Sequence, residues 1–286
     1  MNNGIGPDLG WYDYILVNTS AGKDSLVMLD KVCGEAREAG VIDRVIACHQ
    51  DLGRVEWAGT KALAKEQADK YGVRFISVSR SRDLLHQVEH ERKQWPGQGQ
   101  ARFCTSDQKT KEAYKVMTQL CRELNERHER VEGVKLGRRV RILYCLGLRA
   151  QESDKREVKC STPFVLEDKA MSNPTVRLVS LWLPIADWTE DRVWATIRAK
   201  GLKYHWAYDL GMPRLSCVFC IYAPKPALLL AGYHNRALLS EYVGVEQRIG
   251  HNFKSKTLGL TQIENELKAG YVPAGRIESS AWAQCA

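Results

Sequence analysis

The chain has 286 residues, of which 44% are hydrophobic and 27% charged, a balance typical of soluble globular proteins. No stretch approaches the ~18 consecutive apolar residues of a membrane-spanning helix, and the first residues lack the basic and apolar regions of a secretory signal. Membrane, exported, collagen-like and disordered proteins are therefore not expected. The length allows one or two domains.

The formal net charge of +8 leaves several roles open. A basic surface attracts a nucleotide, a nucleic acid or another polyanion, but it also serves solubility alone. The chain has nine cysteines. Without an export signal we expect a reducing compartment, the cytoplasm, where disulfides are rare. Clustered cysteines then raise the question of metal binding or catalysis.

Strand and helix patterns alternate along the first part of the chain. A buried strand is predicted over residues 13–19, and a polar loop at residues 20–25 separates it from a helix with apolar spacing over residues 26–33. Further strands are predicted over residues 43–48, 73–78, 140–146 and 179–185, and further helices over residues 57–71, 110–132 and 189–199. This alternation predicts an α/β fold in which helices cover both faces of a twisted parallel sheet.

The connections and the C-terminal part are less regular. Residues 157–178 are predicted to form an irregular connection, and Asp187 is predicted to cap the helix that begins near residue 189. Residues 1–200 are expected to form the α/β domain. Residues 201–286 are expected to form a largely helical, cysteine-containing extension that packs on it.

The loop between the first strand and helix has the composition of an anion-binding turn. It consists of Ser20, Ala21, Gly22, Lys23, Asp24 and Ser25. Its small residues let backbone N–H groups approach a phosphate, the next helix offers its positive end, and the lysine and serines add charge-assisted bonds. It is not a Walker A loop, because Val17 stands where that motif has its first glycine. The simpler alternative is a helix cap. We expect the loop to be exposed.

This loop resembles the PP-loop, Ser-Gly-Gly-x-Asp-Ser, of the adenine-nucleotide alpha hydrolase superfamily, with Ala21 in place of the first glycine. Alanine is small, so the loop keeps its shape unless that position requires a positive φ. Later segments are similar, in order, to those of the phosphoadenylyl-sulfate reductase family. They are His49–Thr60, Arg102–Lys109, Gly147–Arg156, Pro184–Trp194, His205–Met212 and Cys217–Cys220. The resemblance implies the nucleotide-binding α/β fold of that superfamily.

The resemblance also implies roles for polar residues outside the loop. Arg149, Ser153 and Arg156 would line the anionic end of the substrate, because arginine forms bidentate pairs with sulfate and phosphate and ligands bind at the carboxyl ends of strands. Pairing of the arginines with neighbouring acids is the alternative. Lys109 is either a phosphate contact or a solvated lysine. Asp51 is either a ribose or Mg²⁺ contact or a turn residue that bonds its own backbone.

Four cysteines are candidate metal ligands. Cys217 and Cys220 have the spacing of metal-binding thiolates. Cys104 stands where the adenylyl-sulfate reductase branch has a cysteine pair that binds a four-iron cluster, with Phe103 in the other place. Cys160 is the candidate for the fourth ligand. A [4Fe-4S] cluster, a zinc ion and reduced thiols without metal are the three alternatives.

Three functions compete. In the first, an ATP pyrophosphatase cleaves ATP between the α and β phosphates and adenylates an acceptor, with Lys23, Asp24 and Arg149 as catalytic residues and Mg²⁺ as the metal. In the second, a cysteine thiol reduces adenylyl sulfate or its 3′-phosphate to sulfite. In the third, the protein is a nucleotide-binding module without turnover.

Two features favour the first function. The loop keeps Lys23-Asp24-Ser25, as in the ATP-sulfurylase small subunit and the DNA-phosphorothioation ATPases, whereas reductases usually lack this complete set. The tail around Cys285 does not match the Glu-Cys-Gly-Leu-His-type motif of reductases. The expected ligand is an adenine nucleotide, and a sulfur-donor protein and a nucleic-acid acceptor are the candidate partners.

Overall fold

A computed structural model describes residues 6–97, 102–254, 258–273, 275 and 277. Its internal contacts divide the chain into two compact units that are discontinuous in sequence. The first comprises residues 1–49, 61–78 and 113–204, and the second comprises residues 50–60, 79–112 and those from 205 on, as far as they are described. The predicted boundary at residue 200 lies near the last junction, but the second unit also takes two earlier segments.

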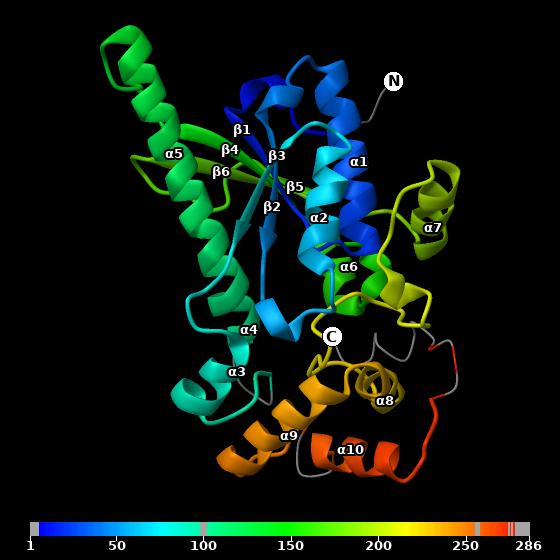
Figure 1. The fold of residues 1–286 in the computed structure, drawn as a ribbon. Helices are drawn as coiled ribbons and strands as arrows, with labels where there is room; N and C mark the ends of the chain where they lie inside the picture. Colours follow the sequence, from blue (N-terminus) through cyan, green and yellow to red (C-terminus); the bar gives the residue numbers. More distant parts are fainter. Residues whose placement is uncertain (1–5, 98–101, 255–257, 274, 276, 278–286) are drawn as a thin grey trace. The chain divides into compact units, whose positions relative to one another are not determined.

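The first unit is built on a six-stranded sheet (Figure 1). The strands are β1 (Tyr14–Asn18), β2 (Val45–Gln50), β3 (Arg74–Val78), β4 (Val140–Cys145), β5 (Phe164–Val165) and β6 (Arg177–Trp182), in the order β3-β2-β1-β4-β6-β5. β1 pairs in parallel with both β2 and β4, and β4 pairs in parallel with β6. Only the short β5 is antiparallel among the pairings described. The predicted α/β class is therefore confirmed.

Helices cover both faces of this sheet, as predicted (Figure 1). They are α1 (Lys23–Glu38), α2 (Thr60–Asp69), α5 (Lys111–Glu132), α6 (Asp154–Cys160) and α7 (Glu190–Ala199). Successive side chains of β1 lie on opposite faces of the sheet. Ile15 and Val17 pack with α1 and α7, whereas Leu16 packs with α5. Burial on both faces explains why the strand reads as an uninterrupted apolar run in the sequence.

Two local predictions are wrong. The connection predicted to be irregular from residue 157 begins inside α6, which Ser153 caps by accepting a hydrogen bond from the N–H of Arg156. The cap of α7 is Thr189, whose side chain accepts from the N–H of Arg192, while Asp187 is exposed. In both places a hydroxyl next to the first helical turn reaches the backbone N–H that needs a partner.

The second unit is helical. It contains α3 (Leu84–His86), α4 (Phe103–Thr105), α8 (Lys225–His234), α9 (Arg236–Ile249), α10 (Leu260–Lys268) and two π-helical turns, Gln87–Arg92 and Ser106–Thr110. Three-residue 3₁₀ turns occur across the chain at Leu9–Trp11, Ile42–Arg44, Gly53–Val55, Ala150–Glu152 and Trp206–Tyr208. Trp57, Trp95, Phe219, Tyr242 and Phe253 share one buried core. No helix in the described part of the chain is long and apolar enough to cross a bilayer.

Candidate functional site

The loop after β1 is held in shape by its own serines and by a neighbouring strand. Ser25 Oγ accepts a hydrogen bond from the N–H of Ser20 at 3.2 Å and donates to the carbonyl of Gly22 at 2.9 Å. The ring of the buried His49 lies 3.0 Å from the carbonyl of Thr19. Gly22 precedes α1 and provides no side-chain cap, so the positive end of the α1 dipole meets a turn of small residues.

Ala21 adopts the left-handed conformation, with φ of +58°. The PP-loop motif has glycine at this position, whereas alanine is strained at positive φ. A left-handed conformation costs a non-glycine residue roughly 1–2 kcal/mol. Ala21 therefore holds this conformation at some expense in stability.

Ala21→Gly is expected to raise the melting temperature by about 2–4 °C, because relief of the left-handed strain outweighs the roughly 0.5–1 kcal/mol of added chain entropy. Ala36→Gly, in the right-handed interior of α1, is the matched control and should destabilise by about 1 kcal/mol. Thermal unfolding of both variants checks this. Equal losses would contradict a left-handed residue at position 21.

Four charged side chains of the first unit meet at the start of α1. Lys23 is only 1% exposed, and its Nζ lies 3.7 Å from Asp24 Oδ2 and 3.6 Å from Glu190 Oε1. Arg149, 3% exposed, donates from Nε to Asp24 Oδ1 at 2.6 Å. The prediction of an exposed loop is thus wrong for Lys23. The two cations and two carboxylates balance in formal charge.

The loop after β4 brings Arg149 to this place. A Cβ atom at Gly147 would lie 3.2 Å from the backbone of Asp24 and Ser25, so glycine permits the close approach. Gln151 Oε1 then accepts from Arg149 Nη1 at 3.2 Å and from the N–H of Glu190 at 2.7 Å. Gln151 and Glu190 were missed by sequence reasoning. Their only signal was their place in two segments that resemble the family.

Ser153 and Arg156 have local partners. Ser153 is the cap of α6, and Arg156 Nε lies 3.9 Å from Glu152 Oε2. This geometry agrees with pairing to a neighbouring acid, the alternative given for Arg156. Contact of either residue with a substrate stays a prediction.

Asp51, in the second unit, accepts a hydrogen bond from the N–H of Gly53 at 2.8 Å, and Gly53 has φ of +64°. Asp51 is therefore a turn residue of the kind that bonds its own backbone. Contact of Asp51 with ribose or Mg²⁺ stays a prediction.

Three of the four candidate cysteines come together in the second unit. Cys104, Cys217 and Cys220 are partly buried and pack against the same apolar core. Burial raises the pKa of Cys217 to about 12, nearby Lys109 opposes this rise, and Cys220 and Cys104 add to it. Lys109 is therefore a neighbour of the thiols.

The fourth candidate, Cys160, belongs to the first unit. It ends α6 and packs in the core between the sheet and α5. Burial raises its pKa, and its electrostatic neighbours are Arg156, Glu152, Lys159 and Arg149 rather than other thiols. The ninth cysteine, Cys285, lies outside the described residues.

A buried hydroxyl faces the same electrostatic environment as the three thiols. Tyr242 Oη is buried and has no hydrogen-bond partner among the described residues. Burial raises the pKa of Tyr242 well above its usual value, with further contributions from Cys217 and Cys220. A buried polar group without a partner costs free energy, so Tyr242 is a candidate donor to a group held by the thiols. No sequence pattern indicated it.

The parallel sheet and the loop ahead of α1 define an α/β protein of the PP-loop class. The chain belongs to the phosphoadenosine phosphosulfate reductase domain family, whose model matches residues 14–223. An adenosine 5′-phosphosulfate reductase of Shouchella clausii (strain KSM-K16) is 31% identical over 80 residues, which are 28% of this chain and 30% of that protein. The chain thus matches less than a third of that relative's length.

Solved structures with a similar course of the chain have low sequence identity. The phosphoadenylyl-sulfate reductase of Candida auris, a phosphate complex, is 15% identical, with 73% of this chain and 83% of that chain covered and a TM-score of 0.41. The FMN adenylyltransferase of Candida glabrata, with FAD and pyrophosphate, is 11% identical, with coverages of 73% and 57% and a TM-score of 0.43. The U34-tRNA thiolase of Methanococcus maripaludis, with its [4Fe-4S] cluster, is 16% identical, with coverages of 95% and 86% and a TM-score of 0.41.

Proposed function

We propose that the protein is an ATP pyrophosphatase that transfers the adenylyl group of ATP to an acceptor. The observation that carries this proposal is the charge arrangement at the start of α1. Lys23 and Arg149 supply two buried cations, and Asp24 and Glu190 supply two carboxylates beside them.

This mixed set of charges suits a magnesium triphosphate. Lysine and arginine bind phosphate oxygens, whereas Mg²⁺ is usually held by one or two carboxylates together with substrate phosphates. Asp24 and Glu190 are the residues that would hold Mg²⁺, which would neutralise charge on the phosphates. Adenylyl sulfate is a phosphate–sulfate anhydride, and its reduction by a thiol needs the cations but no metal for the two carboxylates to hold.

The chain's own residues would act by orientation and charge. The acceptor forms a bond to the α-phosphorus, the bond from that phosphorus to the α–β bridging oxygen breaks, and pyrophosphate leaves with the bonding electrons. Lys23 and the backbone at the start of α1 stabilise the negative charge that grows on the leaving group. Arg149, fixed by Asp24 and Gln151, holds the phosphates in line for this displacement.

We further propose that Cys104, Cys217 and Cys220 bind a [4Fe-4S] cluster. Cys104 and Cys220 both add to the rise in the pKa of Cys217, and all three thiols pack against one apolar core of the second unit. Cysteine thiolates are the usual ligands of such a cluster, and each would bind a different iron. Lys109 and the Tyr242 hydroxyl would offset the negative charge of the sulfurs.

The alternative is reduction of adenylyl sulfate or its 3′-phosphate to sulfite. It is supported by the family and by the 80-residue similarity to an adenosine 5′-phosphosulfate reductase. In this reaction a thiolate attacks the sulfur atom of the substrate and the nucleotide phosphate leaves, so that an S-sulfonated cysteine forms. A second thiol, from the thiol donor, then attacks the cysteine sulfur, a disulfide forms and sulfite leaves with the electron pair of the broken S–S bond. Cys285 is the cysteine of the tail that would serve.

One experiment separates the two reactions. The protein is incubated anaerobically with labelled ATP or with adenylyl sulfate and a thiol donor, and the products are resolved. Formation of AMP and pyrophosphate from ATP, unchanged in Cys285→Ser, is the expected result. Formation of sulfite that disappears in Cys285→Ser would replace the proposal with the reductase, and binding without either product would leave a nucleotide-binding module.

A further inference from the structure

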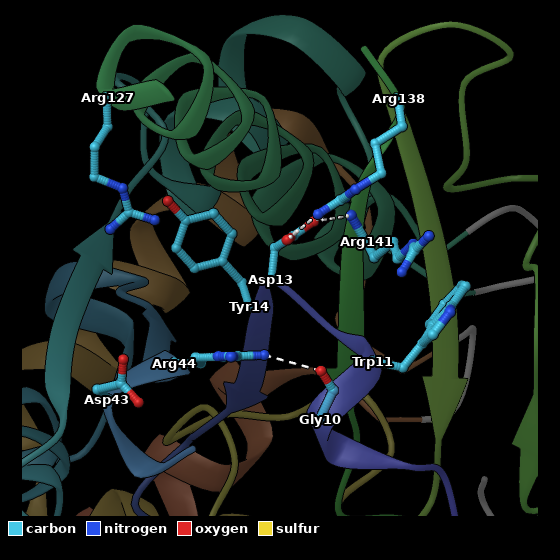
Figure 2. A pocket seen from close by; sticks show the side chains of 9 residues that line it. All are labelled: Gly10, Trp11, Asp13, Tyr14, Asp43, Arg44, Arg127, Arg138 and Arg141. Carbon is cyan, nitrogen blue, oxygen red and sulfur yellow. Dashed lines mark hydrogen bonds and ion pairs between the residues drawn. The ribbon is translucent and has the colours of Figure 1, made fainter. Parts of the chain in front are cut away.

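A pocket of about 410 Å³ lies where strands of the sheet begin, and Figure 2 shows the side chains that line it. Its lining includes the residues that precede or begin β1, β2 and β4, whereas the loop follows the carboxyl end of β1. Since β1 has five residues at about 3.3 Å each, some 15 Å of strand separates the two places. The pocket is therefore not part of the nucleotide site.

The lining of this pocket is basic. It contains four arginines and two aspartates, and the full set is Gly10, Trp11, Asp13, Tyr14, Asp43, Arg44, Arg127, Arg138 and Arg141. The arginines come from three separate stretches of the chain, so the fold rather than a local charge run gathers them. All nine residues belong to the first unit.

One of the two carboxylates is already matched. Arg138 donates from Nη1 and Nη2 to the two oxygens of Asp13, each at 2.7 Å, and the N–H of Arg141 adds a third bond at 2.8 Å (Figure 2). Although burial opposes it, these bonds lower the pKa of Asp13. Asp13 therefore stays ionised and balances Arg138.

The other arginines retain donors for a ligand. Arg44 uses Nη1 to bond the carbonyls of Gly10 and Tyr12, which are neutral acceptors, and Arg141 places its guanidinium 4.3 Å from the ring centre of Trp11. Arg127 is exposed on α5. Carbonyl groups and an aromatic ring do not neutralise a guanidinium. The charges of Arg44, Arg127 and Arg141 therefore exceed the single negative charge of the second carboxylate, Asp43.

The first pocket adjoins a second one of about 230 Å³, in which two arginines and two carboxylates balance in formal charge. The two share Tyr14, Asp43 and Arg127, and the second adds Arg74, which is held by both oxygens of Glu123. The two adjoining hollows share Arg127 and offer two places beside it for anionic groups. A ligand that carries successive phosphates fits this arrangement, because each guanidinium can bind a phosphate with two parallel bonds.

We propose that this arginine pocket is a second phosphate-binding site, distinct from the nucleotide loop, which binds the phosphate groups of a nucleic-acid strand or of a free phosphate compound. The two sources share one chemistry, recognition of phosphate oxygens by Arg44, Arg127 and Arg141. The proposal does not depend on the reaction at the loop, so either can fail without the other.

The test uses the full chain with Arg127→Ala/Arg141→Ala. A fluorescent single-stranded oligonucleotide is titrated by anisotropy at salt concentrations between about 50 and 200 mM. The double variant is expected to bind at least about tenfold more weakly, with the slope of log affinity against log salt reduced by about two. Arg130→Ala/Arg198→Ala removes the same charge from exposed positions outside the pocket and should change affinity much less.

Two controls test whether lost affinity reflects lost arginine contacts. Arg127→Lys/Arg141→Lys should restore part of the affinity, and melting temperatures of the variants equal to that of the wild type exclude misfolding. Inorganic phosphate and pyrophosphate are tested by thermal shift. A shift that the alanine pair abolishes, without oligonucleotide binding, identifies a free phosphate compound as the ligand. If neither probe binds, or if both alanine pairs weaken binding equally, the proposal is overturned.

Discussion

Replacing Lys23 by alanine is expected to weaken ATP binding by about ten- to hundredfold and to abolish pyrophosphate release. Removal of one charge-assisted contact costs roughly 1.5–3 kcal/mol. The change also leaves Asp24 and Glu190 without the cation that lies within 4 Å of both, so their charge repels the phosphates. Asp24→Ala should abolish release as well, because Arg149 loses the carboxylate that orients it.

Lys31→Ala is the matched control for Lys23→Ala. Lys31 lies on the same helix and pairs with Glu35 at the surface, so its loss removes one charge without touching the loop. ATP affinity by calorimetry and pyrophosphate release by a coupled assay should both stay near the wild-type values. Unchanged nucleotide affinity in both Lys23→Ala and Asp24→Ala would remove the basis for assigning this loop to phosphate binding.

Protein purified without oxygen is expected to be brown and to contain iron and sulfide. Cys217→Ser and Cys220→Ser should each bleach it, because a serine hydroxyl is a poor substitute for the thiolate that binds iron. Cys104→Ser should have the same effect. Iron content, sulfide content and the visible spectrum measure the result without any assay of activity.

Cys121→Ser is the control, since Cys121 is a buried cysteine of α5 that packs on the sheet. It should keep its iron, and Cys160→Ser reports whether the remaining ligand comes from the first unit. A colourless anaerobic preparation with one zinc per chain would show zinc instead. A preparation without metal would leave the three cysteines as packing residues.

The strands of the sheet were predictable because the residues that they bury are consecutive in the sequence and mostly apolar. The apolar run at residues 13–19 contains β1, and that at residues 140–146 contains β4, each within a residue or two. Short strands buried on both faces give a continuous apolar signal bounded by polar turns. The loop was found for a similar reason, since its six residues are contiguous and directly follow a strand.

The parts of the site that depend on distant segments were not predictable in the same way. Glu190 approaches Lys23 because β6 and α7 return the chain to the start of α1. The residues next to Glu190 in the sequence do not indicate this contact. The burial of Lys23 arises from the same packing. The arginine pocket is similar, because its charges lie in three separated stretches that only the sheet brings together.

The second unit consists of three segments that are far apart in the sequence, so a ribosome synthesises them at different times. Trp57, Leu84 and Trp95 belong to a core in which most residues, such as Phe219 and Tyr242, come from the last third of the sequence. At about 5–20 residues per second, a ribosome needs roughly 5–20 s to pass from residue 112 to residue 205.

During that interval the early apolar side chains lack the partners that come from the last third of the sequence, whereas the strands of the first unit are already being completed. Transiently exposed apolar surface promotes aggregation, and contacts between distant segments form slowly. We therefore expect the nascent chain to benefit from rapid completion or from chaperone binding at these early segments. A fragment that ends near residue 200 would retain this vulnerability permanently, since the partners of Trp57 and Trp95 would never be synthesised.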